Sequence, residues 1–256
     1  MKASGRGTVA IATAEGTLTD LEDALRRTGH SVVRFNASRF VPTLSAAQLR
    51  RLRDDTWDGI MVSSPRGLEL FLEPVYSSAP KGTRRPVAYV AGEYIATGAA
   101  HLGFNVVRPS GPPSLDAIVA SVPTARPLRL LHPRSDAAGP ALARRLRQKG
   151  HTVRDVLAIR TVRATGMPAG VQAGFRRAGL IVISTPPTFA AVRRLLGPRA
   201  FRELASNVPF RVLGSATRQA AQRAGVRDVA LLDPGPGQRF TPATVASLFD
   251  GRAPAR

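Results

Sequence analysis

Cysteine and long apolar runs are both absent from the 256 residues. Without cysteine, the chain cannot form disulfides, thiolate zinc sites or a thiol nucleophile. No segment reaches the roughly 20 apolar residues that cross a bilayer. Residues 1–19 also lack the apolar run of a signal peptide. We therefore expect a soluble, cytoplasmic protein without a membrane partner.

Cofactor motifs are also missing. There is no GxxxxGK[ST] phosphate loop, no GxGxxG after a predicted strand and no GxSxG nucleophile turn. The histidines are scattered, without the spacing of metal ligands: His30, His101, His132 and His151. Two of them, His30 and His151, follow a glycine at a predicted helix end, where histidine usually caps carbonyl groups. The sequence predicts neither a metal site nor an organic cofactor.

Positive charge is abundant: Lys and Arg number 37 against 17 Asp and Glu, giving a net charge of +20. One interpretation is an arginine-rich composition that fills solvated surfaces. The other is a field that attracts a polyanion, such as nucleic acid or a small ligand with several carboxylates. Aromatic residues make up only 5%, and no stacking platform or recognition motif is visible, which argues against nucleic acid. A two-lobed exported solute-binding protein is disfavoured by the missing export signal.

A strand–turn–helix–glycine unit recurs along the chain. It begins with an apolar run of strand length and ends with a glycine that supplies a left-handed helix cap. Four copies span residues 8–29, 87–103, 128–150 and 210–225, and two further apolar strands cover 59–63 and 180–184. Strands alternating with helices of this length predict an α/β fold with a parallel sheet.

The order of these units repeats at a constant offset. Gly29 and Gly150 lie 121 positions apart, as do the prolines of the SSP and STP turns, Pro65 and Pro186. A constant offset over such landmarks predicts an internal duplication of a half of roughly 120 residues. Each half is long enough to form a domain, so we expect two similar α/β domains.

The turns that follow the strands are the candidate binding sites. In open parallel sheets, ligands bind at the carboxyl ends of strands, beside helix N-termini that favour anions. Serine, threonine and proline are also ordinary helix-capping residues, so each turn alone has a structural explanation. Their number and the positive charge together favour an anion site, whose candidate residues are Ser63, Ser64, Arg66, Gly92, Arg134, Ser135, Thr185, Thr188, Gly214, Ser215 and Thr217.

Six segments, in this order and spacing, resemble the uroporphyrinogen-III synthase family over essentially the whole chain. They are GIMVSSPRGLELF, VAYVAGEYIATGAAHLGFNV, RLLHPRSDAAGPALARRLRQKGHTVRDVLAIRTV, IVISTPPTFAAV, RVLGSATRQAAQRAG and TPATVASLF. The resemblance implies that the domains do not coincide with the repeats. The first would comprise 1–36 and 165–256 and the second 39–160, joined by two linker strands near 35–42 and 159–163.

The same resemblance implies a function. Enzymes of this family, which are hydro-lyases of heme biosynthesis, cyclise hydroxymethylbilane to uroporphyrinogen III with inversion of the last pyrrole ring, in the cleft between the domains. They need no cofactor and act as monomers. The matching positions imply that Ser63, Ser64 and Arg66 line the site in the first half. Thr185 and Thr188, with Gly214 and Thr217, would line it in the second half.

Three positions depart from the family pattern. Ile159 stands on the crossing strand where the family usually has a tyrosine that has been favoured as the acid. Ile95 stands in place of a threonine, and Ala12–Thr13 in place of a Thr–Arg pair. An active synthase would then rely on Tyr94, on Arg134 or on assistance from the substrate itself. The alternative is a relative that binds a tetrapyrrole or another polyanion without catalysis.

Overall fold

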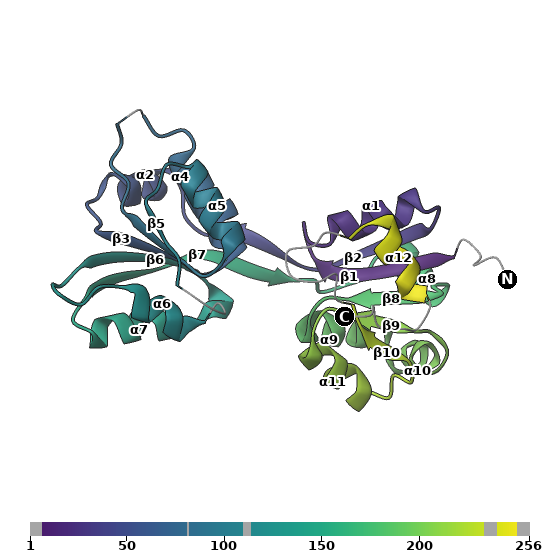
Figure 1. Ribbon diagram of the computed structural model, residues 1–256. Helices are drawn as coiled ribbons and strands as arrows, with labels where there is room; N and C mark the ends of the chain where they lie inside the picture. The colour runs from purple at the N-terminus through teal and green to yellow at the C-terminus, as the bar shows by residue number, and fades with distance from the viewer. Residues whose placement is uncertain (1–6, 81, 110–113, 233–239, 250–256) are drawn as a thin grey trace. The chain divides into compact units, whose positions relative to one another are not determined.

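The computed structural model describes residues 7–80, 82–109, 114–232 and 240–249. It divides into two compact units (Figure 1). Unit 1 comprises Met1–Arg39 and Val162–Arg256, and unit 2 comprises Phe40–Thr161. The chain leaves unit 1 on strand β2 (Ser31–Pro42) and returns on β7 (Thr152–Arg163).

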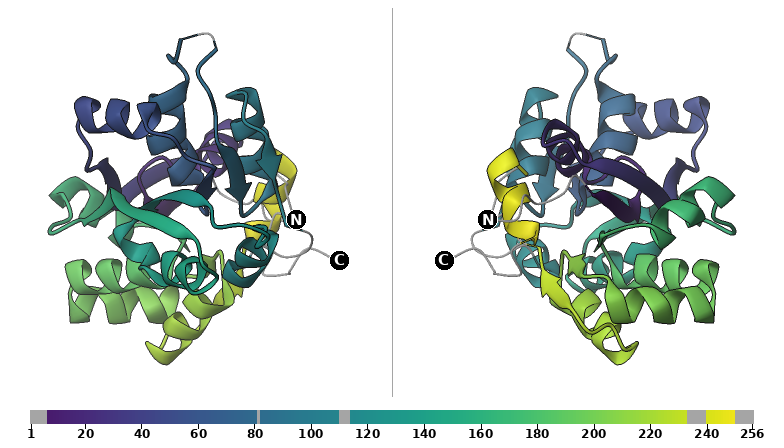
Figure 2. Two further views of the ribbon diagram at one scale, coloured as in Figure 1. Left: turned by 90° about the vertical axis from the view of Figure 1, so that its left-hand side faces the viewer. Right: turned by 90° about the vertical axis from the view of Figure 1, so that its right-hand side faces the viewer.

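The sheet of unit 1 has the strand order β10-β9-β8-β1-β2, and its described pairs are parallel. Its other strands are β1 (Thr8–Ala14), β8 (Leu180–Ile183), β9 (Phe210–Val212) and β10 (Val229–Leu231). Its helices are α1 (Thr19–Arg27), α8 (Ala169–Arg176), α9 (Pro186–Leu196), α10 (Pro198–Asn207), α11 (Ser215–Arg223) and α12 (Pro242–Phe249). The C-terminal helix α12 packs beside α1 (Figure 2).

Strand β1 shows why this sheet is covered on both faces. Val9 and Ile11 belong to one apolar cluster, while Ala10 and Ala12 belong to another. Successive side chains of a strand point to opposite faces. All four side chains are fully buried, as expected for a parallel strand between two helical layers.

Unit 2 has the strand order β7-β6-β3-β4-β5, again with parallel pairs. Its other strands are β3 (Gly59–Val62), β4 (Val87–Val90), β5 (Val106–Val107) and β6 (Arg129–Ser135). Its helical segments are α2 (Ala46–Asp54), α3 (Pro65–Gly67), the π-helical η1 (Leu68–Leu72), α4 (Glu73–Tyr76), α5 (Glu93–His101), α6 (Leu115–Ser121), the 3₁₀ turn η2 (Asp136–Ala138) and α7 (Ala141–Gln148). Helices α2, α4 and α5 cover one face of this sheet, and α6 and α7 cover the other (Figure 1).

The α/β class and the parallel sheet expected from the sequence are confirmed. The four glycines expected to end helices have the left-handed backbone that this position requires, with φ of 85° at Gly29, 82° at Gly103, 88° at Gly150 and 85° at Gly225. The internal duplication, the two-strand linker and the exact domain limits stay predictions. The outermost parts of the first predicted domain, 1–6 and 250–256, lie outside the described residues. Within the described ranges, no helix is long and apolar enough to cross a membrane.

Candidate functional site

In each unit, the candidate turns lie next to one another at the carboxyl edge of the sheet, because the strands that precede them are parallel. In unit 2, the backbone N–H of Ala91 donates to the carbonyl of Val62 at 3.2 Å, which brings the ends of β4 and β3 together. In unit 1, the N–H of Ser184 donates to Ala12 O at 3.2 Å, and that of Leu213 donates to Ile183 O at 3.4 Å. Each unit therefore gathers its own set of candidate residues at the carboxyl edge, where ligands bind in open α/β sheets.

Ser64 and Arg66, which follow β3, are both engaged with neighbouring groups. The Ser64 hydroxyl accepts a hydrogen bond from Gly67 N at 3.2 Å, so it acts as the N-cap of α3. The guanidinium of Arg66 pairs with Glu69 and lies 4.9 Å from the ring centre of Phe40. These contacts stabilise the turn after β3, and they keep the charge of Arg66 close to the edge of the sheet.

Tyr94, in the first turn of α5, reaches the same carboxylate. Its hydroxyl donates to Glu69 Oε1 at 3.2 Å, while Arg66 pairs with Oε2. Partial burial and the nearby negative charge of Glu69 raise the pKa of Tyr94. The side chain is nevertheless 60% exposed. Tyr94 is therefore an exposed phenol that stays protonated at neutral pH and is held beside an Arg–Glu pair.

Arg134 and Ser135 lie at the end of β6. The Arg134 Nε donates to Asp155 Oδ2 at 2.9 Å, and its Nη1 donates to the Ser135 carbonyl at 3.2 Å. The other oxygen of Asp155 lies 2.9 Å from Nδ1 of His132. The carboxylate of Asp155 thus joins a guanidinium and an imidazole, both of which come from the neighbouring strand.

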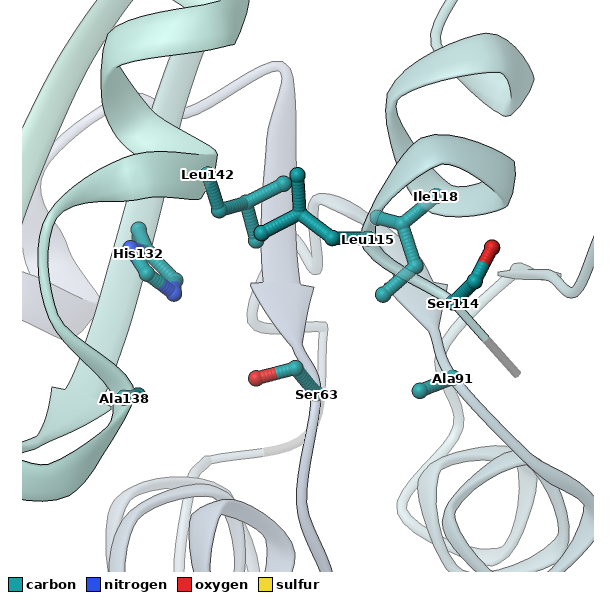
Figure 3. Close-up of a pocket in the computed structure, with 8 residues that line it drawn as sticks. All are labelled: Ser63, Ala91, Ser114, Leu115, Ile118, His132, Ala138 and Leu142. Carbon is teal, nitrogen blue, oxygen red and sulfur yellow. The ribbon is translucent and has the colours of Figure 1, made fainter.

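A pocket of about 180 Å³ opens beside this group in unit 2 (Figure 3). Its polar lining comes from His132, Ser63 and Ser114, and its apolar lining includes Leu115, Ile118 and Leu142. Figure 3 shows the hydroxyl oxygen of Ser63 directed toward the side of the pocket on which His132 lies. Ser63 is the candidate residue of unit 2 that faces this space.

Gly92 and Gly214 precede α5 and α11 in unit 2 and unit 1. Both have extended backbones, with φ of −167° and −153°, so neither needs glycine for its conformation. A Cβ atom at either position would meet nothing within 4 Å. Neither provides a side-chain cap for the helix that follows. Each therefore leaves a helix N-terminus that a ligand can approach down to the backbone.

The unit 1 threonines divide into exposed and buried members. Thr185 is exposed and caps α9: its hydroxyl accepts from Thr188 N at 3.3 Å and lies 2.9 Å from the Thr188 hydroxyl. Thr188 and Thr217 are buried, at 4% and 1% exposure. Ser215 is exposed at the first position of α11. Thr185 and Ser215 are the hydroxyl groups here that an incoming ligand can reach directly.

Two of the positions that depart from the family pattern lie inside unit 2. Ile159, on β7, is fully buried, and Ile95, on α5, is 3% exposed. Both belong to the apolar cluster that also contains Phe71 and Ile60. Ile159 is a core residue at the position where the family resemblance implies a tyrosine.

His132, Asp155 and Ser114 are not among the site residues expected from the sequence. The contact between His132 and Asp155 follows from the register of β6 and β7, which places these two residues side by side. His132 and Arg134 share one face of β6 because they are two residues apart. Among the described residues, no group of three or more His, Asp or Glu side chains is placed to hold a metal ion.

Two comparisons relate the chain to known proteins. The family model described as uroporphyrinogen-III synthase HemD matches residues 19–231. A mutant uroporphyrinogen III synthase of Thermus thermophilus is similar in structure, with a TM-score of 0.62, 13% identity and coverage of 96% of this chain and 98% of that chain. Uroporphyrinogen-III synthetase of Helicobacter pylori has a TM-score of 0.61 and 11% identity, covering 96% of this chain and 100% of that chain. No curated protein sequence matches this chain.

Proposed function

Because the chain belongs to the uroporphyrinogen-III synthase family, which acts in tetrapyrrole biosynthesis, we propose that it is a lyase that closes hydroxymethylbilane into uroporphyrinogen III. In this reaction the terminal hydroxyl leaves as water, a carbon–carbon bond closes the ring, and the last pyrrole is inverted. The reaction needs no metal or organic cofactor. The protein must fold the linear substrate, direct its closure and assist the departure of the hydroxyl.

The observation that carries this proposal is the pair of open glycine turns. Gly92 and Gly214 each leave a helix N-terminus without a side-chain cap and with free space around the Cα atom. The helices that follow, α5 and α11, each have nine residues, long enough for a helix dipole to favour an anion. The substrate carries eight carboxylates, and backbone amides at such turns are suitable partners for them.

Hydroxyl and guanidinium groups supplement these amides. Ser63 in unit 2 and Thr185 and Ser215 in unit 1 are exposed at the same edges of their sheets. Arg66 and Arg134 add positive charge in unit 2, and each is positioned by a carboxylate, Glu69 or Asp155. We propose that these residues bind substrate carboxylates, while the buried Thr188 and Thr217 support the turns from beneath.

Of the two candidate catalytic groups, Tyr94 is the better proton donor. An arginine keeps its proton under all relevant conditions, so Arg134 acts through its charge. The phenol of Tyr94 is exposed and hydrogen-bonded to Glu69, and like any tyrosine of ordinary or raised pKa it carries its proton at neutral pH. We propose that Tyr94 donates a hydrogen bond or a proton to the departing hydroxyl, a role that Ile159 cannot perform.

A second candidate function is supported by Ile159 itself. This isoleucine is completely buried in the apolar core. The position of the family tyrosine therefore has no ionisable group. A relative that binds a tetrapyrrole or another polyanion without closing the ring would share the turns and the positive charge. The isomer composition of the product formed from hydroxymethylbilane separates the two functions, since spontaneous closure gives uroporphyrinogen I.

A further inference from the structure

Buried polar atoms without hydrogen-bond partners are rare in folded proteins, because each costs about 1–3 kcal/mol. Among the described residues, such atoms include His132 Nε2, His151 Nε2 and His30 Nδ1. The ring of His30 stacks on Phe249 at 4.6 Å between ring centres. Of the three, His132 alone lines one of the described pockets.

The protonation of His132 is set by its neighbours. Nδ1 lies 2.9 Å from the carboxylate of Asp155, so in the neutral ring this nitrogen carries the proton and donates it. Nε2 then presents a lone pair. His132 lines the pocket, and Figure 3 shows its ring at the pocket wall. The pocket wall therefore contains a buried hydrogen-bond acceptor without a partner.

The other residues that line the pocket indicate which kind of ligand could bind beside His132. The Ser114 hydroxyl accepts from Ala117 N at 3.1 Å and keeps its own proton free to donate. Leu115, Ile118 and Leu142 offer apolar walls. A volume of about 180 Å³ exceeds the roughly 10–15 Å³ that a cavity needs in order to hold one water molecule. The space suits a small, largely apolar group with one polar edge.

We propose that this pocket binds a neutral hydrogen-bond donor on a small apolar body, and that His132 Nε2 accepts that hydrogen bond after a small rotation of the ring into the adjacent space. The inference rests on the proposed function and deepens it. In a linear tetrapyrrole the donor is either a pyrrole N–H or the terminal hydroxymethyl group. Both are uncharged, as an apolar pocket requires.

The charges around His132 support a neutral ring. Burial lowers the pKa of His132, and the positive charges of Arg134 on β6 and Arg147 on α7 lower it further. Asp155 on β7 opposes this shift. A neutral ring accepts a hydrogen bond at Nε2, whereas a protonated ring cannot. Binding of a donor should therefore weaken as the pH falls, while binding of a carboxylate would strengthen.

The first test is a ¹⁵N NMR titration of the full chain labelled at histidine, with the His132 signal assigned from the His132→Gln variant. The probes are 2-methylpyrrole, which has only the N–H donor, and (1-methylpyrrol-2-yl)methanol, which has only the hydroxyl. A third probe, 1,2-dimethylpyrrole, has neither, and acetate tests carboxylate binding. We expect one or both donor probes to move the Nε2 signal toward its protonated value near pH 8, and this effect to fade at lower pH. The probe that acts identifies the source of the donor.

The second test compares His132→Phe with His151→Phe in the ring-closing assay. Both histidines are buried in unit 2 with an unpaired Nε2, but His151 lies outside the described pockets. Loss of one hydrogen bond should raise KM about tenfold in the His132 variant, with no such rise in the His151 variant. Circular dichroism checks that both variants fold, and the His132→Gln variant, which retains an acceptor, should recover part of the loss.

Three results would overturn the inference. The first is a His132 signal that responds to none of the probes. The second is an equal response to 1,2-dimethylpyrrole, which would reduce the pocket to an apolar hollow. The third is an acetate response that grows as the pH falls, which would make it a carboxylate site. None of these depends on turnover, so a failure here is distinct from a wild-type chain that forms no uroporphyrinogen III.

Discussion

Nδ1 of His132 and Oδ1 of Asp155 lie 2.9 Å apart, at the same register of the adjacent strands β6 and β7. The contact combines a buried imidazole with a carboxylate whose second oxygen is held by Arg134. It fixes which imidazole nitrogen carries the proton and leaves Nε2 as the acceptor. Burial lowers the pKa of His132 in spite of this contact, so the charge state of His132 differs between the folded and unfolded chain.

The stability of the protein should decrease as the pH falls below neutrality. Burial lowers the pKa of both His132 and His151 from the ordinary value of 6.5. Between the folded and unfolded pKa values the unfolded chain binds more protons, so the free energy of unfolding falls as the pH falls. Above pH 6.5 both states are neutral at these sites and the dependence disappears. Urea unfolding at several pH values between about 5 and 8 measures it.

The matched variants are His132→Phe and His151→Phe, each of which removes one of the two titrating groups. Each should show a shallower decline of stability with falling pH than the original chain. If the free energy of unfolding fell equally steeply with pH in both variants and in the original chain, other groups would cause the pH dependence.

Gly174 in α8 is predicted to be intolerant of a side chain. A Cβ atom there would lie 2.6 Å from Val33 Cγ2 and 2.7 Å from Cγ1, on a β-branched side chain that has few alternative rotamers. Gly174→Ala should lower the free energy of unfolding by about 1–3 kcal/mol through overpacking. Gly170 is the second residue of the same helix, and a Cβ atom there would meet nothing within 4 Å. Gly170→Ala should be neutral or stabilising by up to ~1 kcal/mol, and equal urea midpoints for the two variants would contradict the packing of α8 on β2.

Substitution of Gly92 or Gly214 by alanine should reduce activity while leaving the stability of the fold almost unchanged. Gly92→Ala and Gly214→Ala fit the backbone and the space around it, so each should cost at most about 1 kcal/mol of stability as an N-cap change. If substrate carboxylates approach these amides, each added methyl group should reduce kcat/KM about tenfold or more, equivalent to ~1.4 kcal/mol. Gly166→Ala, another glycine with open space, is the control. Full activity in both variants would remove these turns from the substrate site.

Tyr94→Phe tests the proposed proton donor. Loss of an acid catalyst typically costs about 10²–10⁴-fold in rate, so kcat should fall by at least about two orders of magnitude with little change in stability. Tyr76 is a buried tyrosine of the same unit, and its replacement by phenylalanine should leave kcat unaffected. A drop of less than about threefold in the Tyr94 variant, far below that range, would return the donor role to another group or to the substrate itself.

Local rules in the sequence predicted the fold well, but they did not identify the partners of site residues. Gly29 and Gly150 mark helix ends because only a left-handed backbone fits there, and that signal is local. The pairing of His132 with Asp155 depends on the register of two strands separated by a helix, which periodicity does not determine. The same limit applies to Ser114, which lines the pocket although no site was predicted in its segment.

Ile159 shows a different limit. Its identity was visible in the sequence, but its burial was not, because both polar and apolar side chains occur on the strand around it. Arg160 and Leu157, its near neighbours, are exposed and half-buried. The structure places Ile159 in the core, which identifies it as a packing residue and directs the search for the proton donor to Tyr94.

The isomer composition of the cyclised product tests the central claim most directly. Hydroxymethylbilane, generated enzymatically in the presence of the purified chain, is converted to porphyrin by oxidation, and the isomers are separated by chromatography. We predict that uroporphyrinogen III dominates and that its share rises with the amount of protein. Uroporphyrinogen I alone, in the proportion found without protein, would contradict the assignment as a synthase and leave a tetrapyrrole-binding relative in its place.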